Sequence, residues 1–76
     1  MNKYTIQINN QILTRKSKRS DFTHAVVGRP WDGGDAEPSD SFRIIAVRTS
    51  KESAIKELQG WTMNHKDAQV LELQIN

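Results

Sequence analysis

The sequence predicts an α+β fold, in which a single mixed or antiparallel sheet of about five strands carries one helix packed on one face. Three observations predict it. Several segments alternate apolar and polar residues as strands do, one segment has the period of an amphipathic helix, and 76 residues suffice for one small domain, residues 1–76. The expected order is strand, strand, strand, loop, strand, helix, strand.

The first two strands, at residues 4–8 and 11–17, are expected to form a hairpin. In YTIQI the apolar side chains alternate with polar ones, which is the pattern of a half-buried strand. The Asn9-Asn10 pair that follows tolerates the positive φ angles of a tight turn. The segment QILTRKS should therefore return beside the first strand.

The third strand is expected at residues 21–27, DFTHAVV. The residues on both of its faces are mostly apolar or small, which fits a central strand better than an edge strand. His24 lies inside this segment, so we expect it to be a structural residue of the sheet rather than a catalyst.

Residues 28–41 are expected to form a long loop, because glycine, proline and acidic residues dominate the segment. A connection of this length is either disordered or functional. Its carboxylates do not match the alternation of a calcium-binding EF-hand loop, and its prolines restrict how they converge. We therefore expect a loop that folds over and screens the neighbouring basic residues, and no metal site.

The second half of the chain is expected to form a strand at residues 42–48, FRIIAVR, and then a helix that runs to about Asn64. The helix N-cap is either Thr49, which makes a capping box with Glu52, or Ser50. The residues expected on the buried stripe of this helix are Ala54, Ile55, Leu58, Trp61 and Thr62.

The last strand is expected at residues 68–75, AQVLELQI, with Leu71, Leu73 and Ile75 facing inward. His65 precedes it, at the end of the expected helix, where a histidine interacts favourably with the helix dipole.

Composition excludes several classes of protein. The chain has no cysteine, so disulfides and thiolate metal sites are absent. Its longest apolar runs are far too short to cross a bilayer, and its N-terminal segment has no apolar stretch of the secretory type. We expect a cytoplasmic protein with no membrane partner.

The charges are segregated along the chain. Residues 1–31 carry six Lys and Arg and one acid, a net of +5, whereas residues 32–41 carry four acids and no base, a net of −4. Residues 42–76 carry five bases and four acids, which completes the net charge of +2. Such segregation is informative about partners rather than about the fold.

The basic run TRKSKR, residues 14–19, is the strongest candidate for a binding surface. If it stays extended, Arg15, Ser17 and Arg19 share one face, and Lys16 and Lys18 share the other. Two guanidiniums beside a hydroxyl suit a phosphate or a carboxylate, because arginine binds both in a bidentate manner. The alternative is a solvated strand end whose charges prevent edge-to-edge association.

The residues predicted to contact a partner are Arg15, Lys16, Lys18, Arg19, Arg29 and Trp31. Trp31 is included because it is the one aromatic residue expected on a loop, whereas the other four aromatics occupy expected core positions. Tryptophan and arginine dominate binding hot spots. The scarcity of aromatic residues between the basic ones argues against nucleic acid as the main partner.

We expect no catalytic residue, no cofactor and no metal. A nucleophile and base can be drawn from Ser17 or Thr23 with His24 and Asp21, but such combinations arise by chance in most chains of this size.

The segment TRKSKRSDFTHAVVGRP resembles one found in small proteins of phages and other mobile elements. There, Arg, Ser and Arg or Lys occupy alternate positions before an aromatic residue and Thr-His-Ala-Val-Val. The matching residues of this chain are Arg15, Ser17, Arg19, Phe22, Thr23, His24, Ala25, Val26 and Val27. The resemblance implies a genomic setting that includes inhibitors of host defence complexes, such as anti-CRISPR proteins, and implies no chemistry.

Three functional hypotheses follow. The leading one is a non-enzymatic protein-interaction module that binds a protein surface, as a mobile-element inhibitor of a host complex. The second is a protein that binds single-stranded DNA or RNA through the basic run. The third is a small homodimeric structural protein that associates through a sheet face without a covering helix.

Overall fold

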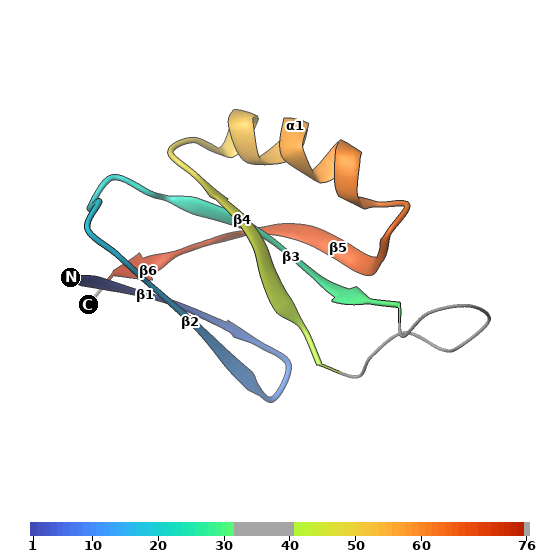
Figure 1. Cartoon of the computed structure of the whole chain (residues 1–76), viewed down its shortest axis with the longest axis horizontal. Coiled ribbons are helices and arrows are strands. Elements are labelled where there is room, and N and C mark those ends of the chain that lie inside the picture. The colour runs from blue at the N-terminus through green and yellow to red at the C-terminus, as the bar shows by residue number, and fades with distance from the viewer. Residues whose placement is uncertain (32–40, 76) are drawn as a thin grey trace.

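The computed structural model describes residues 1–31 and 41–75. Its elements, in chain order, are β1 (Asn2–Ile8), β2 (Gln11–Ser17), β3 (His24–Pro30), β4 (Arg43–Arg48), α1 (Lys51–Trp61), β5 (His65–Glu72) and β6 (Gln74–Ile75). The predicted α+β class is confirmed (Figure 1), and the order of the described elements matches the prediction except that two strands, β5 and β6, replace the single last strand.

The first sheet has the strand order β2-β1-β6, and all its pairs are antiparallel. β1 and β2 form the predicted hairpin, in which Ile8 pairs with Gln11 across a two-residue turn. Asn9 adopts the left-handed conformation that such a turn requires, with φ of 51°. The inward side chains of β1 are buried, as their alternation predicts.

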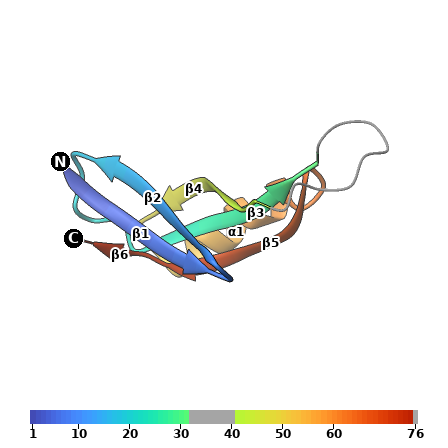
Figure 2. The same ribbon diagram turned by 90° about the horizontal axis from the view of Figure 1, so that it is seen from below.

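The second sheet has the strand order β4-β3-β5, again with antiparallel pairs. β3 is the central strand, as its apolar faces predict, and β4 and β5 are its two edges. The helix α1 packs across one face of this sheet (Figure 1). Figure 2 shows the first sheet on the side away from α1. β3 is therefore covered on both faces.

The prediction of a single sheet of about five strands is wrong, because the strands form two sheets of three. The chain passes from one sheet to the other at Leu73, between β5 and β6. At this point the amide of Leu73 donates a hydrogen bond of 2.8 Å to the carbonyl of Thr23, the residue just before β3. Beyond it the chain pairs with β1, where Ile75 lies opposite Tyr4.

The core lies between the two sheets. Its buried members are Ile6, Ile8, Ala25, Val27, Phe42 and Val47. Tyr4 is fully buried beside them, and its hydroxyl donates a 2.6 Å hydrogen bond to the carbonyl of Arg19. That bond fixes the chain between β2 and β3 against the sheet.

The other face of β3 is covered by α1. Val26 is fully buried but lies outside the core cluster, and Ala54 is the buried residue of the helix. Ser50 is the N-cap, since its hydroxyl accepts a hydrogen bond from the amide of Ser53. The helix ends at Trp61, earlier than predicted.

Two members of the predicted helix stripe are exposed. Ile55 is 40% exposed and Thr62 is exposed beyond the helix end. The short helix meets the sheet along a narrower line, which runs through Ala54, Leu58 and Trp61. The inward assignment of Ile75 is also wrong, because β6 is the edge of its sheet and this side chain is 48% exposed.

The predicted loop begins later than residue 28, because β3 extends through Pro30. The remaining part of that prediction, which concerns the acidic residues 32–40, lies outside the described residues. Within the part of the chain that the structure describes, no helix has the length and apolar character needed to cross a membrane.

Candidate functional site

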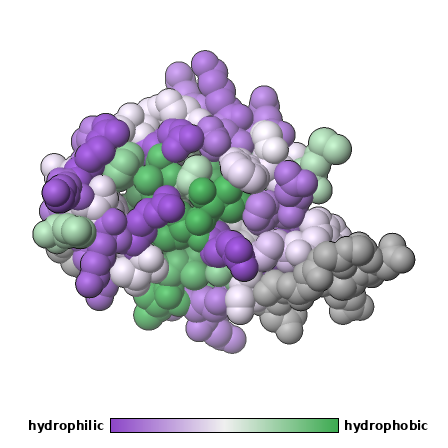
Figure 3. All heavy atoms as spheres, in the orientation of Figure 1, coloured by the Kyte–Doolittle hydropathy of each residue, from purple (hydrophilic) through white to green (hydrophobic). Residues whose placement is uncertain are grey.

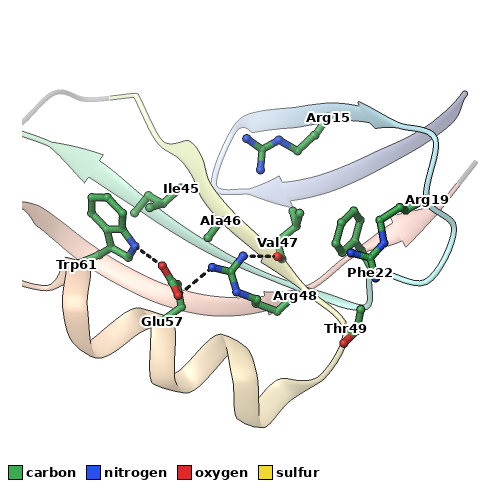
Figure 4. A pocket seen from close by; sticks show the side chains of 10 residues that line it. All are labelled: Arg15, Arg19, Phe22, Ile45, Ala46, Val47, Arg48, Thr49, Glu57 and Trp61. Carbon is green, nitrogen blue, oxygen red and sulfur yellow. Dashed lines mark hydrogen bonds and ion pairs between the residues drawn. The ribbon is translucent and has the colours of Figure 1, made fainter.

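A groove of about 640 Å³ lies over β4, between β2 on one side and α1 on the other. Figure 3 shows hydrophobic surface in the middle of this face of the molecule, bordered by hydrophilic side chains. The residues that line the groove are Arg15, Arg19, Phe22, Ile45, Ala46, Val47, Arg48, Thr49, Glu57 and Trp61 (Figure 4).

The floor of the groove follows the edge of β4. The lining includes five consecutive residues, 45–49, whereas the face of a strand would contribute only alternate residues. β4 pairs with β3 on one side and ends its sheet on the other. The groove therefore exposes a strand edge that is flanked by aliphatic side chains.

β4 contains a bulge at one of the residues that line the groove. Val26 pairs with Ala46 and Val27 with Ile44, so Ile45 is an extra residue without an opposite partner. A bulge of this kind bends its strand and re-aims the side chains that follow. Ala46 and Val47, which follow the bulge, are both buried, because one face of this sheet packs against the first sheet and the other against α1.

Arg15 reaches the groove from β2. It lies opposite Tyr4, so it occupies the face of the hairpin that is turned toward the core. Its guanidinium extends toward β4 (Figure 4). Among residues 1–31 and 41–75, no carboxylate forms an ion pair with it. Among the described residues, Arg15 is thus the arginine of this groove whose guanidinium has no carboxylate partner.

Arg19 lies at one end of the groove and is already paired. Its guanidinium donates to both carboxylate oxygens of Asp21, at 2.9 and 2.6 Å, and stacks 4.7 Å from the centre of the Phe22 ring. The hydrogen bonds between these groups raise the pKa of Arg19 and lower the pKa of Asp21. Arg19 thus shields the aromatic face and contributes less free charge than Arg15.

Arg48 lies at the helix side of the groove, at the end of β4. Its guanidinium contacts the Glu57 carboxylate at 2.8 Å and donates a 2.6 Å hydrogen bond to the carbonyl of Val47. The Trp61 indole also donates to Glu57, at 3.0 Å. The hydrogen bonds from Trp61 and Arg48 lower the pKa of Glu57. This carboxylate therefore stays ionised and suits a structural role better than proton transfer.

The structure divides the predicted basic run. Arg15 and Arg19 line the groove, but Lys16 and Lys18 do not. The alternation of side chains in β2 explains the difference, since Lys16 pairs with Lys3 on the opposite face of the hairpin. The Ser17 hydroxyl accepts a hydrogen bond from the amide of Arg19, so it caps the strand end instead of completing an anion cradle.

The other two predicted residues lie elsewhere. Arg29 is near the far end of β3, where it forms an ion pair with Asp67 at 2.5 Å and lies 5.7 Å from the centre of the Phe42 ring. Trp31 follows that strand and is 46% exposed. Neither residue lines the groove.

Sequence reasoning missed the residues that complete the groove from β4 and α1. Arg48 and Glu57 were given no role, and Trp61 was assigned to the core although it is only half-buried. The spacing of Glu57 and Trp61, four positions apart on a helix, places them on one face and is the signal that could have found them.

The residues considered for catalysis do not assemble into a catalytic set in the described structure. The Thr23 hydroxyl and His24 Nδ1 are 2.8 Å apart, but Asp21 is bound to Arg19. Over residues 1–31 and 41–75, no group of three His, Asp or Glu side chains could hold a metal ion. The described residues of the groove therefore combine arginine guanidiniums with an apolar strand edge.

Comparisons with known proteins give no match, whether with family models, with curated proteins or with solved structures.

Proposed function

We propose that this chain is a non-enzymatic protein-interaction module that binds an acidic segment of a partner protein in the groove over β4. The observation that carries the proposal is the combination of a basic rim and an aliphatic floor. The lining contains three arginines and one glutamate, a net of +2. In the setting that the sequence resemblance implies, the module acts by occupying a surface of a host complex.

The chemistry of the groove supports a carboxylate ligand. Arginine forks bind carboxylates in a bidentate manner, and guanidinium is less strongly hydrated than ammonium. The basic side chains of this groove are all arginine, whereas Lys16 lies on the opposite face of the hairpin and Lys18 does not line the groove. The floor of Ile45, Ala46 and Val47 suits aliphatic side chains of the same ligand.

Single-stranded nucleic acid is the second candidate, and one observation favours it. Phe22 and Trp61 lie in the same groove as the arginines, and bases stack on aromatic rings. Both rings are already engaged, however. Arg19 covers a face of Phe22, and Trp61 contacts His65 edge to face while its indole binds Glu57. Because these contacts leave the rings less free to stack on bases, we rank this candidate below a protein.

A small homodimeric structural protein is the third candidate, and pairing through the β4 edge is the form of it that would occupy the groove. A two-fold pairing of this edge with a second copy would bring the arginines of both copies into one groove, and like charges repel at that distance. We therefore rank a dimer paired through this edge below the other two candidates. A dimer that forms through another face of the protein would not use the groove.

The experiment is a titration of ¹⁵N-labelled protein, followed by two-dimensional NMR, with three probes. The first is the peptide threonine-glutamate-valine-valine-glutamate-valine-threonine, the second replaces both glutamates by glutamine, and the third is a thymidine oligonucleotide. We expect the acidic peptide to shift the amides of Arg15 and of residues 45–49, and the glutamine peptide to bind at least about tenfold more weakly.

Shifts of the same amides by the oligonucleotide alone would favour nucleic acid instead. Absence of binding by the acidic peptide would overturn the proposal. Light scattering on the free protein at the same concentration reports dimerisation, which would support the third candidate if the groove amides shift on dilution.

A further inference from the structure

The edge of β4 provides more than a charged surface. We infer that the partner segment binds as an extended strand, paired with the outer edge of β4, so that the ligand extends the β4-β3-β5 sheet by one strand. This inference rests on the proposed function, because it specifies how the acidic segment occupies the groove. Strand addition of this kind provides main-chain hydrogen bonds for affinity and side-chain contacts for specificity.

The first observation is the continuity of the unpaired edge of β4. Residues 45–49 line the groove without interruption, and β4 is the outer strand of its sheet. Four of these residues, 45–48, belong to β4, and at about 3.3 Å per residue they present an edge of about 13 Å. A ligand with at least about four extended residues therefore spans this edge.

The second observation is the hydrogen bond at Val47. Its carbonyl accepts the bond of 2.6 Å from the Arg48 guanidinium, within the groove (Figure 4). In a free edge strand, a carbonyl on the outer side is otherwise left to solvent, and a charged side chain over it prevents unwanted association. A bound strand would supply a peptide amide for this carbonyl and leave Arg48 to pair with a ligand carboxylate.

The third observation is that the basic side chains flank both sides of the edge. Arg15 approaches from β2, and Arg48 lies on the side of α1 (Figure 4). Successive side chains of an extended ligand point alternately to the two sides. The ligand therefore needs one acidic residue facing Arg15 and another, an odd number of positions away, facing Arg48. Aliphatic residues between them contact Ile45 and Trp61.

A nucleic acid strand or a second copy of the chain would each lack either the amide donors or the carboxylates that this edge suits. A nucleic acid strand has no amide donors at peptide spacing, so it gains nothing from the edge. The edge of a second copy brings its own arginines rather than carboxylates. The combination of a strand edge with cations on both sides favours an acidic peptide.

The test uses the same acidic peptide in three forms, with binding measured by isothermal titration calorimetry. One form is unmodified, the second is N-methylated at its odd positions, and the third at its even positions. Only one edge of the peptide pairs with β4, and N-methylation removes the amide donors of one edge. We expect one methylated form to bind at least about tenfold more weakly and the other to keep the affinity of the unmodified peptide.

The same complex gives a second readout. Amide hydrogen exchange of residues 45–49 should slow when the unmodified peptide binds, and cross-strand nuclear Overhauser effects should connect the peptide to β4. If the unmodified peptide binds and both methylated forms bind equally well, the strand mode is wrong and the acidic-segment proposal stands. If the unmodified peptide does not bind, the proposed function itself fails.

Discussion

The Arg48 guanidinium lies 2.8 Å from the Glu57 carboxylate, and this ion pair joins the end of β4 to α1 at the helix side of the groove. It places the one glutamate of the lining against one of its three arginines. Glu57 therefore competes with any acidic ligand for Arg48. The Trp61 indole donates a hydrogen bond to the other oxygen of this carboxylate and so keeps Glu57 beside Arg48.

The Glu57→Gln variant should bind the acidic peptide several-fold more tightly than the wild type. Glutamine retains an oxygen acceptor for the Trp61 indole but carries no charge to hold Arg48. The pair is partly exposed, so its loss should change the free energy of unfolding only slightly. Calorimetry measures the affinity and urea unfolding measures the stability. Unchanged or weaker binding would contradict a competitive role for Glu57.

Acidification should destabilise the protein in part through Asp21 and Glu57. The pKa of each carboxyl is lowered in the folded state, mainly by a hydrogen bond from Arg19 to Asp21 and from Trp61 to Glu57. A lowered folded pKa contributes stability that is present above the unfolded pKa, about 4 for these groups, and is lost as the pH falls through the folded value.

The measurement is the urea midpoint from pH 7 down to pH 2.5, in the wild type and in the Asp21→Asn, Glu57→Gln double variant. The wild type should lose more stability than the double variant below about pH 4. Parallel curves for the two proteins would show that these carboxyls make no such contribution.

The local structure of β1, β2 and β3 could be predicted because alternation and turn residues are local signals. The Asn9-Asn10 turn and the burial of the β1 side chains depend only on neighbouring residues. The division into two sheets could not be predicted, since it depends on the bond between Leu73 and Thr23, which are distant in the sequence. No pattern within residues 68–75 distinguishes a strand that changes sheets from one that does not.

The candidate site was predicted in part. Arg15 and Arg19 were placed on one face by their spacing, and both line the groove. Arg48 and Trp61 were missed because they line the same groove as these arginines only once α1 is packed across the sheet. The bulge at Ile45, which lies within the aliphatic floor, cannot be recognised from the segment FRIIAVR alone.

Tyr4→Phe should lower the free energy of unfolding by about 1–2 kcal/mol. The Tyr4 side chain is fully buried, and its hydroxyl donates to the Arg19 carbonyl at 2.6 Å. Phenylalanine keeps the edge-to-face contact with Phe22 but removes this donor. Asn2→Ala is the control, because its exposed hydrogen bond of 3.0 Å reaches the same carbonyl and should contribute less than about 0.5 kcal/mol. Equal losses in urea unfolding would contradict the role assigned to the tyrosine.

Two glycine substitutions should have opposite effects. A Cβ at Gly28 would meet the Cβ of His65 at 3.1 Å and the Cδ1 of Ile45 at 3.2 Å, so Gly28→Ala should destabilise the fold by about 1–3 kcal/mol. A Cβ at Gly60 would meet nothing within 4 Å, and Gly60→Ala should stabilise the exposed end of α1 by about 0.5–1 kcal/mol. Thermal unfolding of the two variants tests whether the midpoint temperature falls for Gly28→Ala and rises for Gly60→Ala. A Gly28→Ala variant as stable as the wild type would show that β3 and β5 approach each other less closely.

The most direct test of the central claim is the affinity of the acidic peptide for two charge-reversal variants, Arg15→Glu and Lys16→Glu. The substitutions are adjacent and change the net charge equally, but Arg15 lines the groove and Lys16 lies on the opposite face of the hairpin. Circular dichroism and urea unfolding confirm that each variant is folded. We expect Arg15→Glu to weaken binding at least about tenfold and Lys16→Glu to change it less than about threefold. Equal weakening by both variants would mean that only overall charge attracts the peptide, and would contradict a binding groove over β4.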